Sequence, residues 1–86
     1  MPRVSQFYGI AIYLYYRDHA PPHFHAIYGD HEAVFEIATG AVLAGHLPRR
    51  ARTLVEDWIA SRRDELQQDW DLAVASQPLL PIPPLE

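Results

Sequence analysis

The chain has 86 residues, 49% of them hydrophobic, and a formal net charge of −4 at neutral pH. The length predicts one domain with a modest core, and the hydrophobic content excludes a disordered chain. The chain has no cysteine, which excludes disulfides, thiolate metal sites and cysteine nucleophiles.

The charged residues and the apolar runs restrict the partners. No apolar run is long enough to cross a bilayer and no signal-peptide pattern opens the chain, so we expect a cytoplasmic protein without membrane contact. All seven basic residues are arginines, which favour bidentate contacts with carboxylate or phosphate. The acidic balance disfavours non-specific binding to nucleic acid.

The first half of the chain is typical of a β-meander. Residues 1–6 are expected to be an extended lead-in. Alternating apolar residues and turn signals then predict four strands, over Ile10–Tyr16, His23–Tyr28, His31–Ile37 and Val42–Gly45. The turns at Gly29-Asp30 and Thr39-Gly40 are too short for crossover connections, so the sheet is expected to be antiparallel.

The second half is typical of one long helix. From Leu47 to Val74 the apolar residues recur at helical spacing, and Pro48 suits the first turn. A break near Arg62-Arg63-Asp64 is the alternative. We therefore expect a single α+β domain over residues 1–76, with the helix on one sheet face. Residues 77–86 contain four prolines and are expected to form an extended tail over an apolar surface of this molecule or a partner.

The Gly29-Asp30 turn also predicts the register of the hairpin around it. Counting outwards places His25 opposite Val34 and His23 opposite Glu36. One face then carries Phe24 and Ala26 for the helix to cover. The other face carries His23, His25 and Glu36, and the first strand adds Tyr13 and Tyr15 to it. A slip of one residue would exchange the two faces.

Three of the five histidines lie in the run His19-Ala20-Pro21-Pro22-His23-Phe24-His25. On a strand, His23 and His25 point to the same side, and with Glu36 they form a ligand set that zinc or a redox metal accepts. His19 or His31 would supplement it. Such spacing also arises by chance and no familiar metal motif is present, so hydrogen-bonded surface histidines are the simpler interpretation and no cofactor is expected.

The same pair also suggests acid–base catalysis. His23 and His25 would be the acid and base of a metal-independent ribonuclease, oriented by Tyr15 or Tyr13, with Arg17 holding the phosphate. RNA binding without chemistry is a further alternative, with Tyr13, Tyr15 and Phe24 as stacking platforms. The arginines that begin the helix, Arg49, Arg50 and Arg52, would assist it, although cations oppose the dipole at that end.

The histidine face suggests a partner. It mixes Tyr, His, Ile, Val, Leu and Glu, and one helix cannot cover both faces of the sheet. A surface of this kind is typical of self-association or of binding a protein partner.

Several motifs extend over nearly the whole chain: Ser5-x-Phe7-Tyr8-Gly9-Ile10, Asp18-His19-x-Pro21-Pro22-His23-Phe24-His25-Ala26-x-Tyr28-Gly29-Asp30, Glu32-Ala33, Gly45-x-Leu47-Pro48, Trp58 and Trp70. In these the chain resembles the small uncharacterised bacterial proteins grouped as domain of unknown function 4160. The resemblance implies a short cytoplasmic protein, often encoded beside another small protein as in a toxin–antitoxin pair. It implies no catalytic residues.

We therefore expect a small cytoplasmic interaction module, a homodimer or the partner of a small protein in a toxin–antitoxin-like pair, that acts through its His/Tyr-lined face. Tyr13, His23, His25 and Glu36 are its expected binding residues. The alternatives are the ribonuclease with His23 and His25, and a His/Glu metal-binding protein. The sequence leaves open whether the protein is an enzyme.

Overall fold

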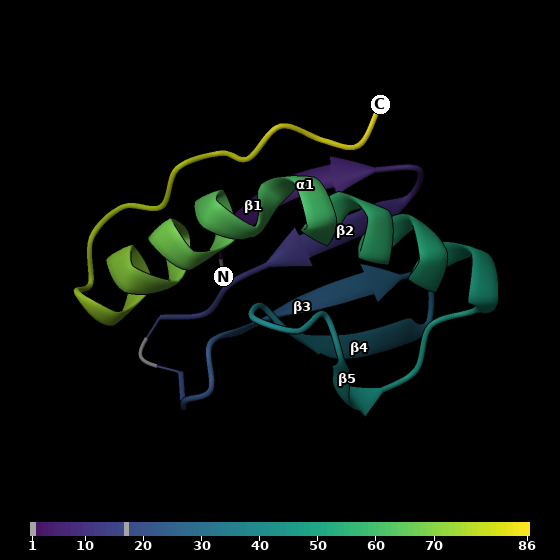
Figure 1. Ribbon diagram of the computed structural model, residues 1–86, viewed down its shortest axis with the longest axis horizontal. Helices are drawn as coiled ribbons and strands as arrows, with labels where there is room; N and C mark the ends of the chain where they lie inside the picture. Colours follow the sequence, from purple (N-terminus) through teal and green to yellow (C-terminus); the bar gives the residue numbers. More distant parts are fainter. Residues whose placement is uncertain (1, 17) are drawn as a thin grey trace.

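The computed structural model describes residues 2–16 and 18–86. Within them an antiparallel five-stranded sheet of order β1-β2-β3-β4-β5 is followed by one long helix (Figure 1). The expected α+β class, antiparallel meander and single long helix are confirmed. The elements are β1 (Arg3–Phe7), β2 (Ile10–Tyr13), β3 (His23–Tyr28), β4 (His31–Glu36), β5 (Val42–Gly45) and α1 (Arg49–Val74).

The sheet has five strands where four were expected, because the segment predicted as an extended lead-in pairs with β2. Phe7 lies opposite Ile10, and Tyr8 and Gly9 connect them as a two-residue turn. Both turn residues have positive φ, 49° and 78°, which is the backbone geometry that tight hairpins favour. Val4 and Phe7 of β1 are buried in the core.

The hairpin of β3 and β4 has the predicted register. His23 pairs with Glu36, His25 with Val34 and Tyr28 with His31. This alignment buries Phe24 and Ala26 completely and directs His25 to the opposite face. The ring of His23, the first residue of β3, also reaches Trp70 of α1. Register fixes which side chains share a face, so the hairpin is what brings His23 and His25 together.

The core lies between the sheet and α1. Trp58 is fully buried and contacts both Phe7 and Phe24, at ring-centroid distances of 5.2 and 5.8 Å. Phe24 in turn stacks on Phe35 at 5.5 Å. The helix continues from Arg49 to Val74, but Arg62 has non-helical angles (φ −124°, ψ 16°). The break that the sequence suggested near this residue is therefore a kink within one helix.

The last ten residues run back beside α1 without regular secondary structure (Figure 1). Ile82 is 4% exposed and joins the core, and its amide donates to the Val4 carbonyl at 2.8 Å. The Trp58 indole donates to the Pro83 carbonyl at 2.9 Å. The tail therefore covers α1 and β1 of its own chain, and it does not cover the histidine face.

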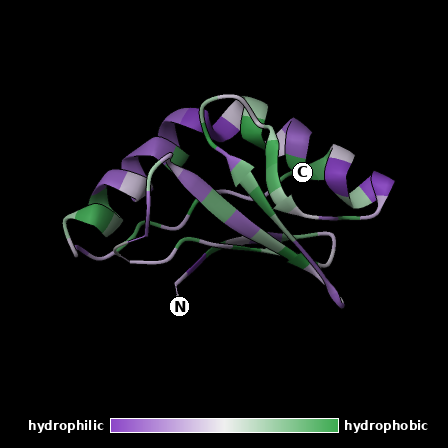
Figure 2. Cartoon of the chain, turned by 90° about the horizontal axis from the view of Figure 1, so that it is seen from below, coloured by the Kyte–Doolittle hydropathy of each residue, from purple (hydrophilic) through white to green (hydrophobic). Residues whose placement is uncertain are grey.

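The sheet face opposite α1 has no helix on it among the described residues (Figure 2). Tyr13, His25 and Val34 are half-buried there, and Leu43 is 46% exposed. Within residues 2–16 and 18–86, no helix combines the length and apolar character that crossing a membrane requires.

Candidate functional site: a histidine–aspartate cluster

One cluster of potential metal ligands is formed within the described residues, by Asp18, His23 and His25. His23 and His25 come from the start of β3, and Asp18 comes from the loop that connects β2 to β3. One ligand atom from each residue lies within 4.8 Å of the others, and all three side chains are partly buried.

The His23 ring is held on both sides. Its Nδ1 lies 2.7 Å from the carbonyl oxygen of Pro21, which only accepts hydrogen bonds, so Nδ1 carries a proton and donates it. Its Nε2 lies 2.8 Å from Oδ2 of Asp18. At this distance Nε2 donates a hydrogen bond to the carboxylate, which only accepts, and a bound metal ion would take the place of that proton.

The His25 ring has the same arrangement. Its Nδ1 lies 3.0 Å from Oε2 of Glu32, and its Nε2 lies 3.6 Å from the same Oδ2 of Asp18. That Nε2 is buried and has no hydrogen-bond partner within the described chain. A buried nitrogen without a protein partner carries a desolvation cost, which a group bound at Nε2 would offset.

The Asp18 carboxylate is fixed by its own loop. Its Oδ1 accepts the backbone N–H of His19 at 2.9 Å, which turns Oδ2 towards the two rings. Burial by itself raises the pKa of Asp18, but the hydrogen bonds from the His19 amide and the His23 ring outweigh it, and the pKa lies below its ordinary value. Asp18 is therefore ionised at neutral pH.

Aromatic rings surround the cluster. Tyr15 packs edge-on against His25 with centroids 4.4 Å apart, and Tyr13 stacks parallel to Tyr15 at 6.5 Å. Trp70 of α1 lies 5.2 Å from His23. Burial, followed by the negative charge of Glu32, raises the pKa of Tyr15 above its ordinary value, so its phenol remains protonated at neutral pH.

The other residues singled out from the sequence lie elsewhere. Glu36 is opposite His23 as expected, but its carboxylate accepts a hydrogen bond from Thr39 and is not part of the cluster. His19 is exposed, and His31 lies beside His46 at 6.0 Å. Arg17, predicted to hold a phosphate, is outside the described residues.

Sequence reasoning missed the two carboxylates that contact the histidines. Neither Asp18 nor Glu32 was among the catalytic, binding or metal-ligating candidates taken from the sequence. The signal for Glu32 was the register, since it lies diagonally across from His25. The signal for Asp18 was its position five residues before His23 in the sequence. The geometry of the loop decides where its carboxylate points.

The separations within the cluster fit a metal ion. Two bonds of about 2.1 Å at a tetrahedral angle place ligand atoms about 3.4 Å apart, close to the 3.6 Å between His25 and Asp18. The 2.8 Å between His23 and Asp18 is a hydrogen-bond distance and would lengthen around an ion. Ligating histidines normally donate their other ring N–H to a carboxylate or a backbone carbonyl. Glu32 and Pro21 supply one acceptor of each kind.

These features define a small α+β protein with one helix on a five-stranded sheet and a histidine–aspartate cluster at the start of β3. Comparison with family models matches residues 9–71 to the domain of unknown function DUF4160, and the chain belongs to this family. The motifs quoted from the sequence had indicated the same family. Neither the curated proteins nor the solved structures contain a match.

Proposed function

We propose that this protein binds one divalent transition metal ion, of the zinc class, through Oδ2 of Asp18 and Nε2 of His23 and His25. One observation carries the proposal. Both histidines present Nδ1 to a hydrogen-bond acceptor, while both Nε2 atoms converge on a single carboxylate oxygen.

The ligand set suits zinc. Imidazole nitrogen and carboxylate oxygen are common zinc ligands, and catalytic zinc sites keep three protein ligands and an open position. Two histidines and one carboxylate also suit ferrous iron, so the metal titration includes both ions. An ion between the three atoms would give the buried Nε2 of His25 the partner that it lacks.

Three ligands leave room for water or a substrate atom, and this gives the proposal a chemical consequence. Zinc makes a bound water acidic enough to act as a nucleophile near neutral pH. Tyr15, whose ring packs against His25, has a protonated phenol that could act as a hydrogen-bond donor in this chemistry. The reaction class we propose is therefore metal-assisted hydrolysis.

The first test is metal binding by tag-free, chelator-treated protein. Zinc titrated against a chromophoric chelator is expected to bind at a ratio of one ion per chain. Asp18→Asn and His25→Ala remove ligands and are expected to weaken binding by at least about 100-fold, more than the loss of an outer partner.

The pair His31 and His46 provides the matched control, since both are exposed histidines beyond the cluster. His31→Ala and His46→Ala are expected to leave the stoichiometry and the affinity unchanged. Zinc binding that persists in Asp18→Asn and His25→Ala, or that falls equally in the controls, would refute the proposal. Tighter binding of ferrous iron than of zinc would change only the identity of the ion.

The metal-independent ribonuclease is a second candidate at the same residues, because the 2.8 Å contact of His23 with Asp18 is also what an acid–base histidine needs for orientation. RNA cleavage measured with excess chelator distinguishes the metal-independent ribonuclease from the metal centre. Cleavage that survives the chelator and is lost in His23→Ala would favour acid–base catalysis. Cleavage that needs added zinc would favour the metal centre.

Partner binding remains a prediction for the rest of this sheet face. Half-buried Tyr13 and Val34 and the exposed Leu43 support it, and the family resemblance suggests a small cytoplasmic partner encoded nearby. Light scattering at high concentration and co-purification with the neighbouring gene product test it. A monomer that captures no such product would contradict it.

A further inference from the structure

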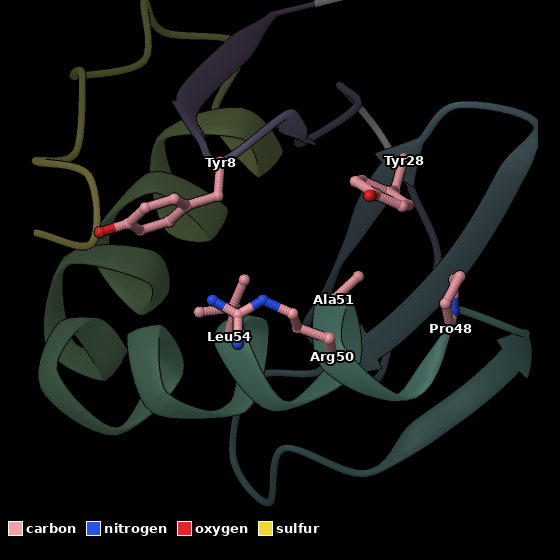
Figure 3. A pocket seen from close by; sticks show the side chains of 6 residues that line it. All are labelled: Tyr8, Tyr28, Pro48, Arg50, Ala51 and Leu54. Atoms are coloured by element: carbon pink, nitrogen blue, oxygen red, sulfur yellow. The ribbon is translucent and has the colours of Figure 1, made fainter.

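Two adjoining hollows lie at the end of β3 away from His23, and Figure 3 shows the first of them. The first has a volume of about 270 Å³ and is lined by Tyr8, Tyr28, Pro48, Arg50, Ala51 and Leu54. The second, of about 460 Å³, shares Arg50 and Leu54 with the first and adds Arg49, Thr53 and Asp57. The second is in the size range of small-molecule sites and the first lies just below that range; the site proposed above shares no residue with either.

Aromatic rings form opposite sides of the first hollow. Tyr8 from the β1–β2 turn and Tyr28 from the end of β3 stand on either side of Arg50 and Leu54 (Figure 3). They are 58% and 38% exposed. Tyr28 ends β3 on the same sheet face as Phe24, and with residues of the start of α1 it lines this hollow. Two partly exposed tyrosine rings beside an aliphatic floor offer apolar surface to a flat ring.

The lining of the two hollows carries two arginines, Arg49 and Arg50, and one carboxylate, Asp57. Among the described residues, the side chains of Arg49 and Arg50 have no ion-pair or hydrogen-bond partner, whereas Arg52 pairs with Glu56 at 3.3 Å. The first turn of α1 contains no acidic residue. Arginines at this end of a helix reduce its stability, so helix formation does not explain them. An anionic ligand would.

We infer that these hollows bind a planar aromatic anion, the class that includes nucleoside monophosphates and aromatic carboxylates. The ring would lie between Tyr8 and Tyr28. The phosphate or carboxylate would contact the guanidinium groups of Arg50 and Arg49, which match such groups in geometry and charge.

The test uses adenosine monophosphate and benzoate as probes. Adenosine, which lacks the anionic group, and inorganic phosphate, which lacks the ring, are the controls. Calorimetry measures the affinity, and the NMR signals of the tyrosine rings show where on the protein the probe binds. We expect at least one aromatic anion to bind saturably and to shift Tyr8 and Tyr28, with adenosine and phosphate weaker by about tenfold or more. If adenosine monophosphate binds more tightly than benzoate, the ligand is a nucleotide. If benzoate binds more tightly, the ligand is an aromatic carboxylate.

Variants locate the charge contact. Arg50→Gln is expected to weaken binding about tenfold or more, without loss of thermal stability because the residue is exposed and unpaired. Arg52→Gln, which removes a charge already paired with Glu56, is expected to have little effect. The inference is overturned if neither aromatic anion saturates, if phosphate alone binds as tightly as the monophosphate, or if both variants weaken binding equally.

Discussion

In His23 and His25 the two ring nitrogens have different surroundings. Each Nδ1 faces an acceptor, the Pro21 carbonyl for His23 and the Glu32 carboxylate for His25. Each Nε2 faces Asp18. Hydrogen bonds at Nδ1 occupy that nitrogen and orient both rings, so Nε2 is the atom of each ring that would bind a metal ion, in exchange for its contact with Asp18.

Glu32→Gln tests this outer contact directly. The amide is a weaker acceptor for the Nδ1–H of His25, so the ring loses orientation and basicity. We expect zinc affinity to fall about 10- to 100-fold while the stoichiometry stays at one. Glu36→Gln is the control, since the Glu36 carboxylate contacts Thr39. An equal loss in both variants would show that general surface charge, and not the contact with His25, sets the affinity.

Asp69 is a buried carboxylate with a structural role. It is 1% exposed, and its Oδ1 accepts the Leu80 amide at 2.9 Å. Burial, with the nearby charge of Glu65, raises the pKa of Asp69 above its ordinary value despite that hydrogen bond. The folded state therefore holds this proton more tightly than the unfolded state, and stability falls as pH rises from the ordinary value through the raised one.

Asp69→Asn removes this pH dependence because the amide keeps an oxygen for Leu80 and carries no charge. We expect the variant to be more stable than the wild type by about 1 kcal/mol at neutral pH and equally stable at acidic pH. Urea unfolding at both pH values measures the difference. Asp64→Asn, at an exposed position, should not change the pH dependence of stability. A lower stability of Asp69→Asn than of the wild type at neutral pH would show that the charge of Asp69 is needed.

At the scale of elements, β5 supports the strand that carries Glu32. Gly45 has φ 76°, and a Cβ there would lie 2.1 Å from the Glu32 carbonyl oxygen. Only glycine allows this approach, and His46 then donates its amide to the same oxygen at 2.9 Å. The end of β5 thus fixes the backbone from which Glu32 reaches His25.

Gly45→Ala is expected to cost about 2–4 kcal/mol, because it adds a steric clash to an unfavourable backbone conformation. Gly29→Ala separates the two effects, since Gly29 also has positive φ, 58°, but open space around it. Its cost should be nearer 1 kcal/mol. Chemical denaturation measures both, and equal losses would contradict the proposed clash.

Turn chemistry and periodicity were sufficient to predict the hairpin and the helix. The two-residue Gly29-Asp30 turn leaves one alignment for β3 and β4, and so places His23 and His25 on one face. β1 was missed because its pattern is short and because Tyr8-Gly9 is not a typical hairpin turn sequence. Asp18 was missed because no periodicity governs a loop, and its side chain is directed by a local bond to the His19 amide.

At the scale of the whole molecule, the tail completes a core that one helix leaves open. Ile82 is buried against it while Leu80, two residues earlier, is 51% exposed. We expect Ile82→Ala to lower the free energy of unfolding by about 2–4 kcal/mol, because a buried side chain is lost. Leu80→Ala should change it by less than about 0.5 kcal/mol. Urea unfolding measures both variants. Equal losses of stability in Ile82→Ala and Leu80→Ala would contradict the packing of the tail against the core.

The most direct test of the metal centre is the ¹⁵N NMR spectrum of the histidine ring nitrogens during zinc titration. The arrangement of the cluster predicts that Nε2 of His23 and His25 moves to the metal-bound position at one equivalent of zinc. Their Nδ1 atoms should stay protonated, and the signals of His31 and His46 should not change. Unchanged Nε2 signals of His23 and His25 at saturating zinc, or binding through Nδ1, would contradict the proposed site.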